Sequence, residues 1–187
     1  MSPTKMMAYC TNVHAGAGIA ETRENLVRYA VEVKRRFSPD APMGLGLWLS
    51  AVAARELIEA GGVDEFGSWL SSEGLVPITM NGFPFGDFHQ EVVKHDVYLP
   101  VWGDAARTKY TLDLVQILDR ILPVGMVGTI STLPVAWGGE SDASTTSCSL
   151  RAAAEQLLHV AQRLAQLKRE TSREIVLCIE PEPGCFF

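Results

Sequence analysis

The alternation of short apolar runs with amphipathic helical stretches constrains the fold of this chain more than any other feature. Runs rich in β-branched and apolar residues fit buried strands, and the stretches between them place apolar residues at three- and four-residue spacing. This order is typical of βα units, whose strands form a parallel sheet. No linker or low-complexity segment divides the 187 residues, so we expect a single domain over residues 1–187.

Five strands and the helices between them can be placed by residue range. Strands are expected at 7–14, 43–50, 75–82, 127–133 and 174–180, with helices at 22–37, 64–72, 104–122 and 149–171 and another that Ser50 caps and that runs through Ala60. The connections between them include two long loops, 83–103 and 134–146. The fifth strand has no helix after it, so we expect the chain to be the N-terminal part of a longer domain.

The phase of the polar strand residues distinguishes a barrel from an open sheet. A closed barrel takes roughly 250 residues, whereas a doubly wound sheet fits within this length. Polar residues share one phase of the expected strands: Cys10, Asn12, His14, Thr79, Asn81, Thr129, Ser131, Cys178 and Glu180. The opposite phase holds the apolar residues Val13, Ile78, Met80, Ile130, Leu177 and Ile179. An open sheet would be comparably apolar in both phases. The pattern therefore predicts a parallel (β/α) TIM barrel, truncated after about five βα units, with the polar set facing its C-terminal mouth.

Glu180 is the sharpest candidate for chemistry. A carboxylate at the end of a buried strand is costly to desolvate unless a cation or a hydrogen-bonding substrate compensates it. A divalent metal is the commonest compensation, and it would act as a Lewis acid on a carbonyl or hydroxyl oxygen. The alternative is that Glu180 and Glu182 form the solvated acidic start of a turn that Pro181 and Pro183 stiffen.

Two loops supply further candidate ligand contacts. His14 precedes the loop 15–18 and is either a ligand contact or a histidine held by ordinary hydrogen bonds. This loop is no dinucleotide fingerprint, because Glu21 stands where the third glycine would be and would repel a pyrophosphate. The stretch from Asn81 to His89 suits a rim over a small polar ligand, or alternatively an Ω-like loop held by its own aromatic residues.

The remaining mouth candidates are spread over the later loops, and other function classes have little support. Lys94, Asp96, Tyr98 and Trp137 could each lie at the mouth. A net charge of −6 leaves no basic excess for phosphates, so no nucleic-acid partner is expected. The four cysteines form no C-x-x-C pair, which favours reduced thiols in a cytoplasm. No apolar leader or membrane span is indicated, and serine-hydrolase, P-loop and zincin motifs are absent.

These motifs together resemble a known family. The chain looks like the EboE-type metabolite traffic proteins, within the xylose-isomerase-like TIM-barrel superfamily of sugar phosphate isomerases and epimerases. The resemblance runs through nearly the whole chain and rests on the stretches 9–14, 45–50, 81–86, 88–89, 93–94, 96–98, 110–114, 131–134 with Trp137, and 180–185.

The resemblance implies a metal site to which this chain contributes one ligand. Proteins of the superfamily hold a divalent metal with a glutamate after the fifth strand, which maps to Glu180, and with ligands from later strands that lie beyond this chain. Glu180 would be metal ligand and general base together, with Mn, Mg, Co or Zn bound in the full-length protein. His14 and Asn81 would contact substrate, while Ala15 departs from the proline expected there.

The function expected is that of a sugar phosphate isomerase or epimerase in a cytoplasmic pathway that makes or moves a small metabolite. Glu180 is the expected catalytic residue, and His14, Asn81, His89, Trp137 and Glu182 are the expected substrate contacts. The partners expected are a sugar-like metabolite and a second copy in a homodimer. Two alternatives stay open: a non-enzymatic metabolite-binding or trafficking component, and a complete open α/β domain that binds a small anionic ligand.

Overall fold

A computed structural model describes most of the chain. The described residues are 6–87, 89, 97–137 and 143–186, with the backbone alone for 136–137, 143–149 and 186. Lys94 and Asp96, expected at the mouth, lie outside the described residues. Among the described residues, no helix combines the length and the apolar character that a membrane crossing requires.

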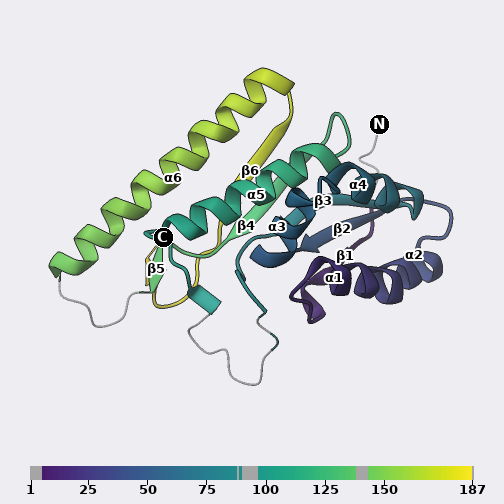
Figure 1. Cartoon of the computed structure of the whole chain (residues 1–187), viewed down its shortest axis with the longest axis horizontal. Coiled ribbons are helices and arrows are strands. Elements are labelled where there is room, and N and C mark those ends of the chain that lie inside the picture. The colour runs from purple at the N-terminus through teal and green to yellow at the C-terminus, as the bar shows by residue number, and fades with distance from the viewer. Residues whose placement is uncertain (1–5, 88, 90–96, 138–142, 187) are drawn as a thin grey trace.

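A parallel five-stranded sheet forms the centre of the structure (Figure 1). Its strands follow the chain order, and each pairs in parallel with the next: β1 (Ala8–Cys10), β2 (Met43–Trp48), β3 (Leu75–Asn81), β4 (Val127–Thr132) and β6 (Glu174–Ile179). The predicted α/β class with a parallel sheet is therefore confirmed. Within the described residues, β1 and β6 are the two edges of this sheet, so closure into a barrel stays a prediction.

The helices agree with their predicted positions, and Ser50 caps its helix as expected. The first helical run comprises α1 (Ile19–Asn25), the π-helical η2 (Leu26–Val31) and α2 (Glu32–Phe37), followed by α3 (Ala51–Glu59), α4 (Val63–Ser72), α5 (Ala105–Ile121) and α6 (Ala143–Thr171). Ser50 caps α3 by accepting the N–H of Ala53 at 3.0 Å, and Asp104 caps α5 in the same way. Only α6 starts much earlier than residue 149, where the sequence placed it.

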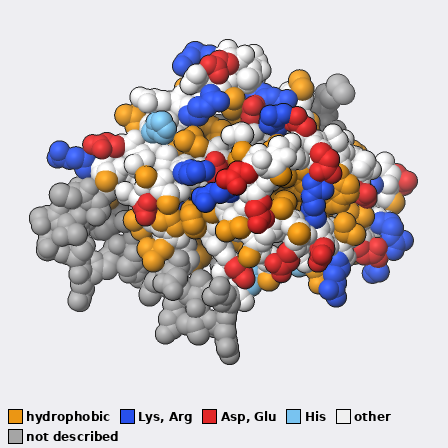
Figure 2. Space-filling model, viewed as in Figure 1, with side chains coloured by type: hydrophobic (Ala, Val, Ile, Leu, Met, Phe, Trp, Pro, Cys, Tyr) orange, Lys and Arg blue, Asp and Glu red, His pale blue; other side chains and the backbone are white. Residues whose placement is uncertain are grey.

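The helices pack against one phase of the strands. Leu45, Leu47, Met80 and Ile130 point to this side and are buried in the main core, together with apolar residues of α3, α4 and α5. Neighbouring helices contact one another in series, α1 with α3, α3 with α5 and α5 with α6, so they form one layer (Figure 1). Acidic and basic side chains are interspersed over the face seen in Figure 2.

The opposite phase of the strands forms a second face with a different composition. Cys10, Gly46, Thr79 and Thr129 lie across from one another in register, and Trp48, Asn81, Ser131 and Cys178 form the next row. Cys10 and Cys178 are exposed, while Thr79, Thr129, Asn81 and Ser131 are half-buried. We call this surface the polar face.

Two local predictions were wrong. The first strand was expected over 7–14, but β1 ends at Cys10 and a single 3₁₀ turn, η1 (Thr11–Val13), follows. Asn12 and His14 therefore do not continue the strand alternation. Ile78 was placed with the core-facing set, yet a register shift opposite Leu45 and Gly46 brings its Cδ1 beside Gly44, on the side of Ala8.

A small antiparallel pair was not foreseen from the sequence. β5 (Ala136–Trp137) pairs with β7 (Cys185–Phe186), so the connection after β4 is joined to the segment after β6. A two-residue strand is too short to show an alternation pattern, and its partner lies almost fifty residues away. The pair ties together two loops at the carboxyl end of the sheet.

Candidate functional site

The carboxyl ends of β3 and β4 carry a ladder of hydroxyl and amide groups on the polar face. Thr129 Oγ1 lies 2.7 Å from Thr79 Oγ1, and Ser131 Oγ donates to Asn81 Oδ1 at 3.4 Å. These pairs span adjacent parallel strands at positions that are in register. The predicted sharing of one face by Thr79, Asn81, Thr129 and Ser131 is therefore confirmed.

Asn81 has a defined amide orientation. Its Oδ1 also accepts the backbone N–H of Phe83 at 3.0 Å, in an Asx turn that starts the connection after β3. Both contacts fall on the oxygen, and the described residues supply no partner for Nδ2. An amide has two N–H donors on that nitrogen, so Asn81 can donate to an oxygen atom of a ligand.

Glu180 follows β6 at the same end of the sheet. Its backbone N–H donates to Thr132 O at 2.9 Å, so it continues the pairing with β4. It is half-buried and follows Cys178 by two residues, which places it in the phase of the polar face. The predicted site residues Asn81 and Glu180 thus come from strand ends of one parallel sheet.

Trp137 and Glu182 lie in the two segments that the β5–β7 pair joins. Trp137 pairs with Cys185 through the backbone, and Cys185 closes a turn by donating its N–H to Glu182 O at 3.1 Å. Tyr98 lies close enough to Glu182 and Cys185 for their charges to affect the pKa of its hydroxyl. Burial raises the pKa of Tyr98, and the charges of Glu182 and Cys185 add to that rise.

His14 lies on the β1–β2 side of the structure, where η1 turns the chain after β1. Its Nε2 is 2.6 Å from the hydroxyl of Tyr9, and its ring stacks on Tyr29 of η2 with centroids 3.9 Å apart. Tyr9 pairs in register with Leu45, a residue of the helix-covered side. Burial lowers the pKa of His14, and the nearby His89 lowers it further.

The space beside His14 is small. Tyr9, Thr11, Asn25 and Trp48 are among the residues that line a cavity of about 10 Å³, room for about one water molecule. This cavity does not accommodate a sugar. No hydrogen bond or ring contact among the described residues joins His14 to Asn81 or Glu180, and the gathering of the three around one ligand stays a prediction.

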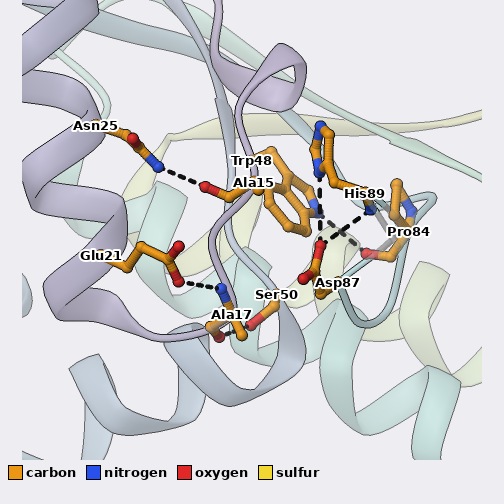
Figure 3. Close-up of polar contacts among 9 residues, drawn as sticks. All are labelled: Ala15, Ala17, Glu21, Asn25, Trp48, Ser50, Pro84, Asp87 and His89. Carbon is orange, nitrogen blue, oxygen red and sulfur yellow. Dashed lines mark hydrogen bonds and ion pairs between the residues drawn. The ribbon is translucent and has the colours of Figure 1, made fainter. Parts of the chain in front are cut away.

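His89 lies on the connection after β3, close to Asp87 and Trp48 (Figure 3). Its backbone N–H donates to the carboxylate of Asp87 at 3.0 Å, its ring nitrogen Nδ1 lies 3.6 Å from the same oxygen, and its ring centroid is 5.9 Å from that of Trp48. Trp48 in turn donates its indole N–H to Pro84 O at 3.2 Å. His89 therefore packs at the end of β2.

The loop 15–18 is occupied by the protein's own side chains, as Figure 3 shows for Glu21, Asn25 and Ser50. Glu21 accepts the N–H of Ala17 at 3.0 Å, and Glu56 of α3 accepts the N–H of Ile19 at 2.9 Å. The carboxylates of Glu21 and Glu56 thus accept hydrogen bonds from the backbone N–H groups that a phosphate would need. This geometry agrees with our rejection of a dinucleotide fingerprint.

Arg107 and Tyr110 of α5 are important residues to which sequence reasoning assigned no role. Arg107 is fully buried and donates from Nη1 to Gly82 O at 2.9 Å and Phe83 O at 3.0 Å, and from Nε to Pro100 O at 2.9 Å. Tyr110 donates its hydroxyl to Leu49 O at 2.6 Å. Spacing could have revealed Arg107, because it shares a helix face with Tyr110 and Leu114.

The described residues form no group of three or more His, Cys, Asp or Glu side chains that could hold a metal ion. Glu180 is available as one oxygen ligand, but the described part of the chain does not surround it with others. A divalent metal therefore does not fit the described residues alone, and the metal site stays a prediction about residues beyond them.

The chain was compared with known proteins at three levels. No protein-family model, curated protein or solved structure matches it. The resemblance to metabolite traffic proteins therefore stays a prediction that rests on the motifs quoted above.

Proposed function

We propose that the chain is part of a parallel βα barrel and binds a small sugar-like metabolite at the carboxyl ends of β3, β4 and β6. The observation that supports this most is the gathering of uncharged hydrogen-bonding groups on a sheet face that the described helices do not cover. Asn81, Ser131, Thr79 and Thr129 present amide and hydroxyl groups there. Such groups suit the hydroxyls of a sugar.

The activity proposed is isomerisation or epimerisation of that metabolite, in a pathway for making or moving it. Glu180 is the residue assigned to proton transfer, because its carboxylate follows the polar row of β4 and β6 at the carboxyl end of the sheet. A divalent metal would polarise the substrate carbonyl if later parts of a longer protein complete its ligands. Asn81 would donate to a substrate oxygen and orient it.

The metal-binding part of this proposal concerns a longer protein that supplies the remaining ligands, because the described residues offer Glu180 alone, and it can be tested there with Mn²⁺. Bound Mn²⁺ broadens nearby amide resonances, so substoichiometric Mn²⁺ should broaden residues 131–133 and 178–182 first. Glu180→Gln should abolish this selective broadening, because an amide is a poorer ligand than a carboxylate. Glu170→Gln, at an exposed position of α6, is the matched control and should leave it unchanged.

Broadening that Glu180→Gln does not alter would remove Glu180 from the metal site. If sugars bind in a titration but none of their carbon-bound protons exchanges with D₂O, the result would favour a non-enzymatic binding or trafficking component over an isomerase or epimerase. The open-domain alternative predicts instead that an anion such as inorganic phosphate shifts amides of the loop 15–18, where Glu21 and Glu56 now bind.

A further inference from the structure

One buried cation, Arg107, binds backbone carbonyl groups of the connection after β3. Arg107 has no exposed surface, and its guanidinium reaches carbonyl groups at both ends of the connection: Gly82 and Phe83 where it leaves β3, and Pro100 just before α5. Three carbonyl oxygens at 2.9 to 3.0 Å compensate its charge. The rings of Phe85 and Tyr110 lie 5.5 and 5.7 Å from its Cζ.

A short chain of contacts leads from this cation to the polar face. Arg107 binds the carbonyls of Gly82 and Phe83, and the N–H of Phe83 donates to Asn81 Oδ1. The N–H of Gly82 donates to Ser131 O at 2.8 Å, so the same two peptide groups are also joined to β4. The position of this turn decides which way the Asn81 amide points.

We propose that Arg107 is a positioning residue that acts through the Gly82–Phe83 backbone to hold Asn81 with its two amide N–H donors turned toward the ligand. The inference rests on the proposed function only in taking Asn81 as the ligand contact. Arginine suits this role because its planar group offers five donors in a fixed geometry. Lysine has a single ammonium and cannot hold carbonyls at both ends of the connection in the same way.

The test uses amide hydrogen exchange and the side-chain N–H₂ resonances of asparagine in the unliganded chain. In Arg107→Met, the amides of Gly82 and Phe83 should exchange about tenfold faster or more, because their hydrogen bonds lose support. The N–H₂ resonances of Asn81 should shift as its rotamers average. The exchange of the strand amides of Leu47 and Ile130 should accelerate less than that of the turn amides of Gly82 and Phe83.

Arg107→Lys and chemical rescue keep the inference testable if Arg107→Met is unstable. Arg107→Lys should show the same local changes to a smaller extent. In Arg107→Ala, millimolar guanidinium should restore the Asn81 resonances, whereas ammonium should not. Arg120→Met is the control, because Arg120 lies on the same helix but is exposed and paired with Asp64.

Three results would overturn the inference. The first is a folded Arg107→Met protein whose Asn81 resonances and turn amides match the parent. The second is exchange that accelerates equally in Leu47 and Ile130, which would make Arg107 a residue of general stability. The third is loss of folding in both Arg107→Met and Arg107→Lys, since the effect would then not be local. No ligand is present, so failure of sugar or metal binding would not mimic any of these results.

Discussion

Gly82→Ala tests the close approach between the turn after β3 and strand β4. A Cβ on Gly82 would lie 2.8 Å from Ser131 O, 3.0 Å from Leu114 Cδ1 and 3.1 Å from Ile130 Cγ2. The nearest atom is a backbone oxygen that accepts the N–H of Gly82 itself at 2.8 Å, so it cannot move away without straining that bond. Neither Leu114 nor Ile130 has space to yield, because both are buried.

The magnitude follows from these two effects. Overpacking a filled core costs about 1–3 kcal/mol, and weakening one hydrogen bond adds about 1 kcal/mol. We therefore expect Gly82→Ala to lower the free energy of unfolding by about 2–4 kcal/mol, which for a chain of this length is a decrease in Tm of roughly 5–15 °C. Urea denaturation followed by circular dichroism measures this value.

Gly86→Ala is the matched control in the same connection. No atom of the described residues lies within 4 Å of its added Cβ, and Gly86 is exposed. Its free energy of unfolding should stay within about 0.5 kcal/mol of the parent, or rise slightly through a less flexible unfolded chain. If Gly82→Ala were as stable as Gly86→Ala, the packing of this turn against Ser131 would be refuted, and with it the placement of Asn81.

Two further changes test the interior and the environment of His14. Tyr110→Phe removes a buried hydroxyl bonded to Leu49 O and should cost about 1–3 kcal/mol in urea denaturation; no loss would show that this bond contributes nothing. The fold lowers the pKa of His14, so the folded protein favours the neutral imidazole. The stability that this contributes is present above the unfolded pKa of about 6.5 and is lost as the pH falls below that value. The free energy of unfolding should therefore decrease from pH 7 to pH 5. This decrease should be less steep in His14→Phe than in the control His159→Phe, which changes an exposed histidine of α6. Equal slopes in the two variants would contradict this expectation.

Strand phase was the part of the site that sequence could predict. Thr79 and Thr129, and likewise Asn81 and Ser131, were assigned to one face, and the register of β3 with β4 places each pair side by side. Alternation is a local property of an extended chain, so it can be read without knowing the neighbours. The Ser50 cap was an equally local signal.

The parts that failed depend on contacts between distant segments. His14 was counted along a strand that instead ends at Cys10, and it is held by Tyr29, fifteen residues later in the chain. Spacing could indicate that Arg107 is buried, but not which groups it binds, because Gly82 and Phe83 lie 25 and 24 residues before it. No local pattern specifies such partners.

The central claim is that the polar face at the ends of β3, β4 and β6 is where a ligand binds. Titration of the ¹⁵N-labelled chain with D-xylulose and with D-fructose 6-phosphate, followed by amide chemical shifts, tests it most directly. The account predicts saturable shifts at residues 79–82, 129–133 and 178–182, weakened by Asn81→Ala. Shifts confined to the helix-covered side, or none for either sugar up to high concentration, would contradict it.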